Sequence, residues 1–271
     1  MRTGDIRSVP LAFWLFGFLT LLYAYLLVAD PPVDSADDVL TLLIIVAPLV
    51  FATAIAWAAP VDRRFLWGAA FIAASAVPNL IEMALARFAF SSFDWGIGLR
   101  PSSATWGLEL IGVVFIALAI GRIQQRRNWL WPLLGLAIFV IGDVENAFYW
   151  AGNPFPEEEL GVAYPIASIA ITFIGGLTVL SWSYLLGSAI EHGRQLFAIG
   201  AGIFVALSAF GLVNEIVYSF LYPNPETADF TYTSLFFSSV RAAGWVALIV
   251  AALTDVPRRS SARELEPEPA T

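Results

Sequence analysis

Residues 129–150 have the sequence WLWPLLGLAIFVIGDVENAFYW, which is apolar except near its end, where Asp143, Glu145 and Asn146 occur. A helix that crosses about 30 Å of hydrocarbon needs about 20 mainly apolar residues. The stretch therefore predicts a membrane-spanning helix. It also places ionisable side chains inside the span, where a charged group is costly.

The whole chain has the composition of a membrane protein. Hydrophobic residues make up 59% of it, charged residues 13%, and the mean hydropathy is +0.75, whereas a water-soluble domain carries about a quarter charged residues. The fold class that we expect is all-α, a polytopic membrane helical bundle with about eight transmembrane helices. Besides 129–150, we predict helices over 9–28, 39–59, 65–86, 103–121, 163–190, 196–220 and 231–253.

The arginines indicate the orientation, because basic residues concentrate on the cytoplasmic side of membrane proteins. Most of them occupy the N-terminus, alternate connections and the C-terminus, while acidic residues occupy the other connections, as in 157–159. The outer segment 90–102, which holds Arg100 with Asp94, is the exception. We expect a multi-pass protein of the plasma membrane with both termini in the cytoplasm. The first apolar run is longer than a signal-peptide core and lacks a small-residue cleavage site, so we favour an uncleaved helix over a signal peptide.

Two segments differ in composition. Residues 1–256 form the expected transmembrane domain, and the polar, proline-containing residues 257–271 are expected to be a disordered cytoplasmic tail. Within the first segment, Gly-Asp-Val-Glu-Asn from Gly142 resembles Gly-Leu-Val-Asn-Glu from Gly211. The similarity is compatible with four helical hairpins that repeat, or with chance similarity among apolar helices.

Several classes of membrane protein are excluded by residue types. The chain has no cysteine and a single histidine, His192, so it cannot supply a bis-histidine haem, a histidine-rich diiron site or a thiolate-bound metal. All 14 basic residues are arginine, which excludes a retinal Schiff base on lysine. We expect no cofactor, no metal and no nucleic-acid partner.

The predicted helices contain polar groups that are costly in lipid. A charged side chain at the bilayer centre costs about 2.5–3.5 kcal/mol on insertion scales, so such residues normally face the bundle interior. Aromatic residues lie one helical turn from several of them. The whole set is Glu82, Glu109, Asp143, Glu145, Glu215 and Arg241, with Asn79, Asn146 and Asn214, and the aromatic Trp106, Tyr149, Tyr218 and Trp245.

Counting along the helices places these groups in one layer of the outer half of the membrane, which predicts a shared polar cavity. The alternative is a set of separate structural contacts, in which each carboxyl group is hydrogen-bonded or paired on its own. An acidic and aromatic cavity has the chemistry for acid-initiated carbocation reactions of a lipophilic, isoprenoid-type substrate. In that hypothesis Asp143, Glu145, Glu215 and Glu82 are catalytic, and the other residues of the set bind substrate.

Two short segments carry a resemblance to a known family. Asn214, Glu215 and Tyr218 form an Asn-Glu-x-x-Tyr run, and Asn79 and Glu82 form an Asn-x-x-Glu run. Both resemble the helix-borne acid segments of the integral-membrane terpene cyclases of meroterpenoid pathways. The resemblance implies a compact helical enzyme with a pair of acids, which would be Glu82 and either Glu215 or Asp143.

Two other functions remain open on the sequence. Carboxylates inside the membrane and acidic outer connections are also typical of a proton- or cation-coupled transporter or channel. A lipid-binding or assembly protein without catalysis is the third interpretation. The partners expected in the enzyme hypothesis are membrane lipid and a lipophilic small molecule, and the sequence indicates no oligomeric state.

Overall fold

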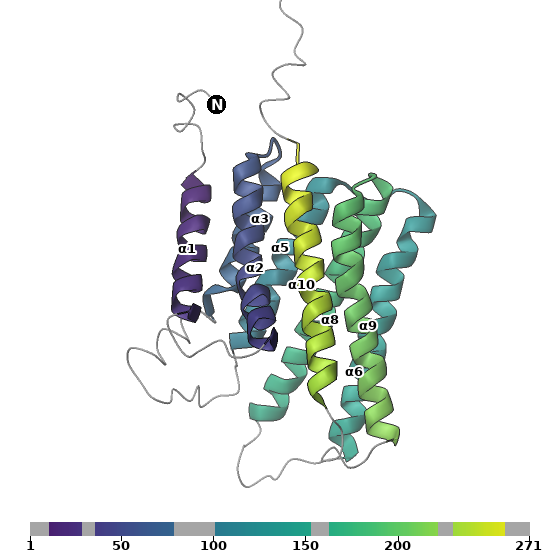
Figure 1. The fold of residues 1–271 in the computed structure, drawn as a ribbon. Helices are drawn as coiled ribbons and strands as arrows, with labels where there is room; N and C mark the ends of the chain where they lie inside the picture. Colours follow the sequence, from purple (N-terminus) through teal and green to yellow (C-terminus); the bar gives the residue numbers. More distant parts are fainter. Residues whose placement is uncertain (1–10, 29–35, 79–100, 153–162, 222–229, 258–271) are drawn as a thin grey trace, which may run out of the picture.

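The structure, a computed structural model, describes residues 11–28, 36–78, 101–152, 163–221 and 230–257 (Figure 1). This part of the chain is all-helical and has no β-strand, which confirms the predicted all-α class. It contains eight α-helices and one short 3₁₀ helix: α1 (Leu11–Val28), α2 (Ala36–Ala58), α3 (Arg63–Ser75), α5 (Pro101–Ile120), η2 (Arg126–Trp129), α6 (Leu130–Gly152), α8 (Ala163–Glu191), α9 (Gln195–Leu221) and α10 (Phe230–Thr254).

The observed helices begin and end within a few residues of the predicted ones. The exception is the third, expected over 65–86, because α3 ends at Ser75 and residues 79–86 of the prediction lie outside the described residues. Among the described residues, three helical stretches are long and apolar enough to cross a membrane, and they are Phe173–Glu191, Gln195–Asn214 and Phe236–Thr254. Three shorter apolar helical stretches are Leu11–Tyr25, Leu43–Ala58 and Thr105–Ile120.

Six helices form a closed ring. The helices α2, α3, α5, α8, α9 and α10 each pack on the next, and α10 packs on α2 to complete the circle. The other two lie outside it, since α1 packs on α2 and α6 packs mainly on α8 (Figure 1). A cavity inside the ring is therefore bordered by helices, which keep their backbone polar groups satisfied internally.

The start of α3 is fixed by a polar cap. The Asp62 carboxylate accepts a hydrogen bond of 2.9 Å from the backbone N–H of Arg64, as an N-cap residue does. The Arg64 guanidinium also binds this carboxylate at 2.6 Å, and that hydrogen bond holds the pKa of Asp62 below its usual value. The chain therefore begins a new helix after a connection of only four residues, with α3 beside α2.

Glycines allow two pairs of ring helices to approach closely. A Cβ on Gly112 of α5 would lie 2.6 Å from Cγ1 of Ile72 and 2.9 Å from the Gly68 carbonyl of α3. A Cβ on Gly200 of α9 would lie 3.1 Å from the Gly244 carbonyl of α10. Small residues at crossing points let helix backbones touch, as is common in membrane proteins.

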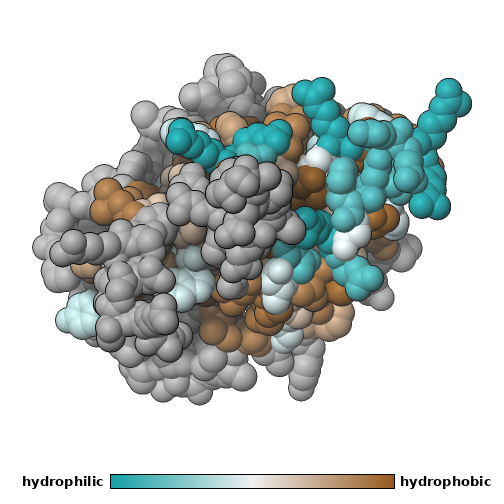
Figure 2. All heavy atoms as spheres, turned by 90° about the horizontal axis from the view of Figure 1, so that it is seen from above, coloured by the Kyte–Doolittle hydropathy of each residue, from teal (hydrophilic) through white to brown (hydrophobic). Residues whose placement is uncertain are grey.

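The described connections 59–62, 121–129 and 192–194 lie at one end of the bundle, which we call the arginine end (Figure 1). Exposed side chains there include Arg63, Arg64, Arg122, Arg126 and Arg127, and hydrophilic atoms collect on this face in Figure 2. The beginning of α1 and the end of α10 lie at the same end (Figure 1).

Hydrogen bonds join the connections of the arginine end to each other. The Arg194 guanidinium donates to the Asp255 carbonyl at 2.7 Å. The Glu191 carboxylate, at the end of α8, accepts from the backbone N–H of Gln124 at 2.9 Å. These bonds tie the ends of α5, α8, α9 and α10 into one layer.

The close contact between α3 and α5 gives the first prediction. We expect Gly112→Ala to destabilise the protein by about 1–3 kcal/mol, because the added methyl group overpacks the crossing of the two helices. The control is Gly17→Ala on α1, where a Cβ would meet no atom within 4 Å. Thermal unfolding of both variants in detergent is the measurement, and equal melting temperatures would contradict the close crossing.

Candidate functional site

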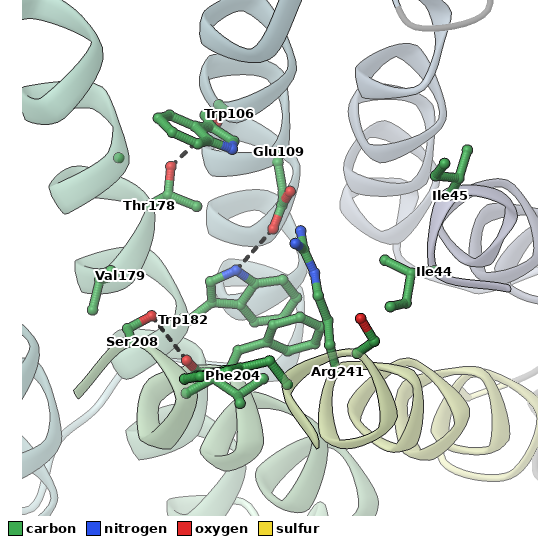
Figure 3. Close-up of a pocket in the computed structure, with 14 residues that line it drawn as sticks. Ile44, Ile45, Trp106, Glu109, Thr178, Val179, Trp182, Phe204, Ser208 and Arg241 are labelled. Carbon is green, nitrogen blue, oxygen red and sulfur yellow. Dashed lines mark hydrogen bonds between the residues drawn. The ribbon is translucent and has the colours of Figure 1, made fainter. Parts of the chain in front are cut away.

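A cavity of about 550 Å³ lies inside the ring of helices. Five ring helices, α2, α5, α8, α9 and α10, contribute its walls (Figure 3). The size is that of a site for a small organic ligand. Its lining consists of Ile44, Ile45, Trp106, Glu109, Gly175, Thr178, Val179, Trp182, Phe204, Leu207, Ser208, Phe237, Ser238 and Arg241.

Glu109 of α5 is the acidic residue of this lining. Its side chain is buried, with 6% of the residue exposed. The indole N–H of Trp182 on α8 donates a hydrogen bond of 3.0 Å to Oε1 of Glu109 (Figure 3). A buried carboxyl group needs such a partner, because an unsatisfied one costs several kcal/mol. The bond joins α5 to α8 and fixes the direction of the carboxyl group.

Arg241 of α10 is the basic residue of the lining. Its guanidinium points toward the Glu109 carboxyl group in Figure 3. In the part of the chain that the structure describes, the two groups do not approach to ion-pair distance, and the Arg241 residue is exposed. The guanidinium is thus held near a carboxyl group while its N–H donors are accessible from the cavity.

Aromatic rings form one wall of the cavity. Trp182 stacks on Phe204 of α9 with ring centroids 4.4 Å apart and an interplanar angle of 16°. Behind them, the buried Trp245 of α10 makes edge contacts with both rings, at 6.1 Å and 5.3 Å. No hydrogen-bond partner for the Trp245 indole N–H occurs among the described residues. The same Trp182 ring therefore positions the acid and offers an aromatic surface.

Hydroxyl groups add further polar atoms to the lining. Thr178 donates to the Ile174 carbonyl at 2.9 Å and lies 3.3 Å from the Trp106 carbonyl of α5. Ser208 donates to the Phe204 carbonyl at 2.9 Å. Because both hydroxyl hydrogen atoms are donated to backbone carbonyl groups, the two hydroxyl oxygens are available to a ligand in the cavity chiefly as hydrogen-bond acceptors.

The polar groups share one depth in the bundle. At 1.5 Å per residue, Glu109 lies about 17 Å from the arginine end of α5, Trp182 about 14 Å from that end of α8, and Arg241 about 20 Å from that end of α10. The site is therefore near the middle of the bundle.

The structure brings together part of the residue set that the sequence singled out. Trp106, Glu109 and Arg241 line the one cavity, and Trp245 lies directly behind its aromatic wall. Asp143 of α6 and Asn214 of α9 are described but are not among the lining residues. The side chains of seven others lie outside the described part of the chain, namely Asn79, Glu82, Glu145, Asn146, Tyr149, Glu215 and Tyr218.

The sequence analysis did not predict Trp182 or Phe204 as site residues. One signal for Trp182 exists, because Gly175, Thr178 and Trp182 recur at helical spacing on one face of α8. Small, polar and aromatic residues on one face are unusual for a helix side that meets lipid. Phe204 offers no comparable signal, since it stands in the apolar run of α9.

The described residues contain no group of three or more histidine, cysteine, aspartate or glutamate side chains that could hold a metal ion. The arrangement instead offers one carboxyl group, one guanidinium and a set of aromatic faces around a partly open cavity. Such groups can bind a polar atom of a lipophilic molecule or exchange a proton with it.

Comparisons with known proteins give no family model, no curated protein and no solved structure that matches the chain. Together, the fold and the cavity define an all-helical bundle of membrane-protein type with an acid–arginine pair at its centre. The function of the chain is therefore inferred from the chemistry of this cavity.

The bond between Trp182 and Glu109 gives the second prediction. Trp182→Phe should destabilise the protein by about 1–3 kcal/mol, because it leaves a buried carboxyl group without its donor. A double-mutant cycle with Glu109→Leu isolates the pair, since the loss of the indole N–H should matter less once the carboxyl group is absent. Unfolding in detergent measures the coupling, and additive effects of the two substitutions would contradict the bond.

Proposed function

We propose that the chain is an integral membrane enzyme that acts on a lipophilic, isoprenoid-type substrate by acid-initiated chemistry in the central cavity. The observation that carries the proposal is the buried Glu109 carboxyl group, held by the Trp182 indole beside stacked aromatic rings. In this proposal all eight helices cross the membrane. The arginine end faces the cytoplasm, because basic residues collect there.

In the proposed reaction, Glu109 is the general acid. Oε1 is engaged by Trp182, so Oε2 is the oxygen that carries the proton to an alkene carbon or an epoxide oxygen of the substrate. The resulting cation is attacked by a second double bond of the same molecule, and loss of a proton to the Glu109 carboxylate ends the reaction. The sum is an isomerisation, so no co-reactant is needed.

The cavity walls support such a cation. Aromatic faces attract cations by about 0.5–2 kcal/mol each, and Trp106, Trp182 and Phe204 line the cavity. Exclusion of water by the surrounding helices would protect the intermediate from capture by water. The short resemblance of the Asn79 and Asn214 segments to membrane terpene cyclases supports the same reaction class.

The proposal moves the acid from the residues that the sequence favoured to Glu109. Asp143 is outside the cavity lining, whereas Glu109 is inside it. A transporter for protons or cations is the alternative function.

The proposed topology can be tested because the chain has no cysteine. A single Gln125→Cys at the arginine end should react with a membrane-impermeant maleimide only in inside-out vesicles. Glu158→Cys, in the connection between α6 and α8, should react in intact cells. The reverse labelling pattern would overturn the orientation, and labelling of both positions from one side would overturn the number of crossings.

The proposed acid can be tested with Glu109→Gln, which keeps the shape of the side chain but cannot donate an acidic proton. We expect turnover of polyprenyl or epoxy-polyprenyl substrates to fall at least about 100-fold, as for loss of a general acid. Product analysis of membrane incubations is the measurement.

The matched control is Asp255→Asn, an acid at the arginine end beside Thr254, which should keep turnover within about twofold. Loss of turnover in Asp143→Asn but not in Glu109→Gln would place the acid at Asp143. Proton flux into dye-loaded proteoliposomes without any product would favour the transporter.

A further inference from the structure

Arg241 is not required by the proposed acid chemistry, yet it lines the cavity. A guanidinium in an apolar environment is costly unless a negative group compensates it. Glu109 and Arg241 are the two charged residues among the described side chains of the lining. The other walls come from α2, α8 and α9 and add aliphatic, aromatic and hydroxyl groups there.

The geometry leaves room for a ligand at the guanidinium. Arg241 faces Glu109 without an ion pair between these two described residues, and it is exposed in the cavity. A guanidinium presents its N–H donors as a planar fork, which matches the two oxygens of a carboxylate or phosphate. Ser238 lies one turn earlier on the same helix and also lines the cavity.

The remaining wall is suited to a hydrocarbon chain. The stacked Trp182 and Phe204 rings lie beside Ile44, Leu207 and Phe237 in the lining. A ligand that contacts both regions is amphipathic, with one anionic group and one apolar chain. The apolar chain of this ligand follows from the proposed function, on which this inference rests. The anionic group of the ligand goes beyond that proposal.

We propose that the cavity binds its lipophilic ligand through one anionic group, a carboxylate or a phosphate, on Arg241, and that Glu109 competes with this group for the guanidinium. In the free protein the Glu109 carboxylate and the ligand anion compete for one positive charge, in a cavity where their repulsion is stronger than in water. Once the anion is bound to Arg241, this repulsion favours proton uptake by Glu109, which then serves as the acid in its protonated form.

The test uses three ligands with the same C20 chain and different head groups: radiolabelled geranylgeranoate, geranylgeranyl monophosphate and the neutral geranylgeraniol. Binding to the purified full-length protein is measured in nanodiscs. We expect at least one of the two anions to bind at least about tenfold more tightly than the alcohol, as for a hydrogen bond to a charged group. The anion that binds more tightly identifies the carboxylate or the phosphate as the ligand chemistry.

Two variants should act in opposite directions. Arg241→Gln should remove the preference for anions and leave the alcohol affinity within about twofold, whereas Glu109→Gln should strengthen anion binding several-fold by removing the competing charge. A purely structural role of the pair would weaken binding of every ligand in both variants. If Arg241→Gln does not fold, Arg241→Lys keeps the charge but not the fork, and it should bind anions less tightly than the unmodified protein.

The outcomes separate this inference from the proposed function. Equal affinities for the alcohol and both anions would overturn the inference and leave the lipophilic enzyme intact. Weaker anion binding in Glu109→Gln would overturn the competition between the two groups. Tight anion binding without turnover of any isoprenoid would support the anion site and overturn the enzyme.

Discussion

The cost of placing charge in an apolar interior governs this structure. Glu109 and Arg241 stand near mid-depth in helices that carry no other charged residue, and facing lipid is costly for both. Both line the cavity inside a ring of six helices, and the Trp182 indole satisfies the carboxyl group from a third helix. The cavity and its aromatic wall thus give both groups a surface other than hydrocarbon to face.

Much of the fold was predictable because lipid imposes a simple rule on sequence. A segment without water must satisfy its own backbone, so long apolar runs become helices of a defined length. The ends of α6, α8, α9 and α10 followed directly from where those runs stop. The order in which the helices pack around the ring could not be predicted in this way, because it depends on helix crossings such as that of Gly68 with Gly112. In the sequence, a glycine at such a crossing cannot be told from a glycine such as Gly17, where an added Cβ would meet no atom within 4 Å.

The kinds of residue that form the site could be predicted from the sequence, but not which of these residues lie next to one another. Ionisable residues within apolar runs stand out, so the sequence selected both Glu109 and Arg241. It could not choose among the acids, because Asp143 occurs in an equally apolar run and differs only in lying on α6, outside the ring. Trp182 was missed because its signal, a face of α8 shared with Gly175 and Thr178, does not indicate which residue the indole contacts. Its importance comes from its hydrogen bond to Glu109, which lies 73 residues earlier in the chain on α5.

The order of the ring has a consequence for biosynthesis. Ring closure joins α10, the last helix of the described residues, to α2, and Glu109 on α5 is synthesised well before Trp182 and Arg241 exist. In the proposed membrane topology the carboxyl group therefore enters the bilayer without either partner, and the bundle stays open on one side until α10 has been made. A ribosome that stalls before residue 230 would thus release an open half-ring that displays an acid to lipid, which membrane quality-control proteases could recognise.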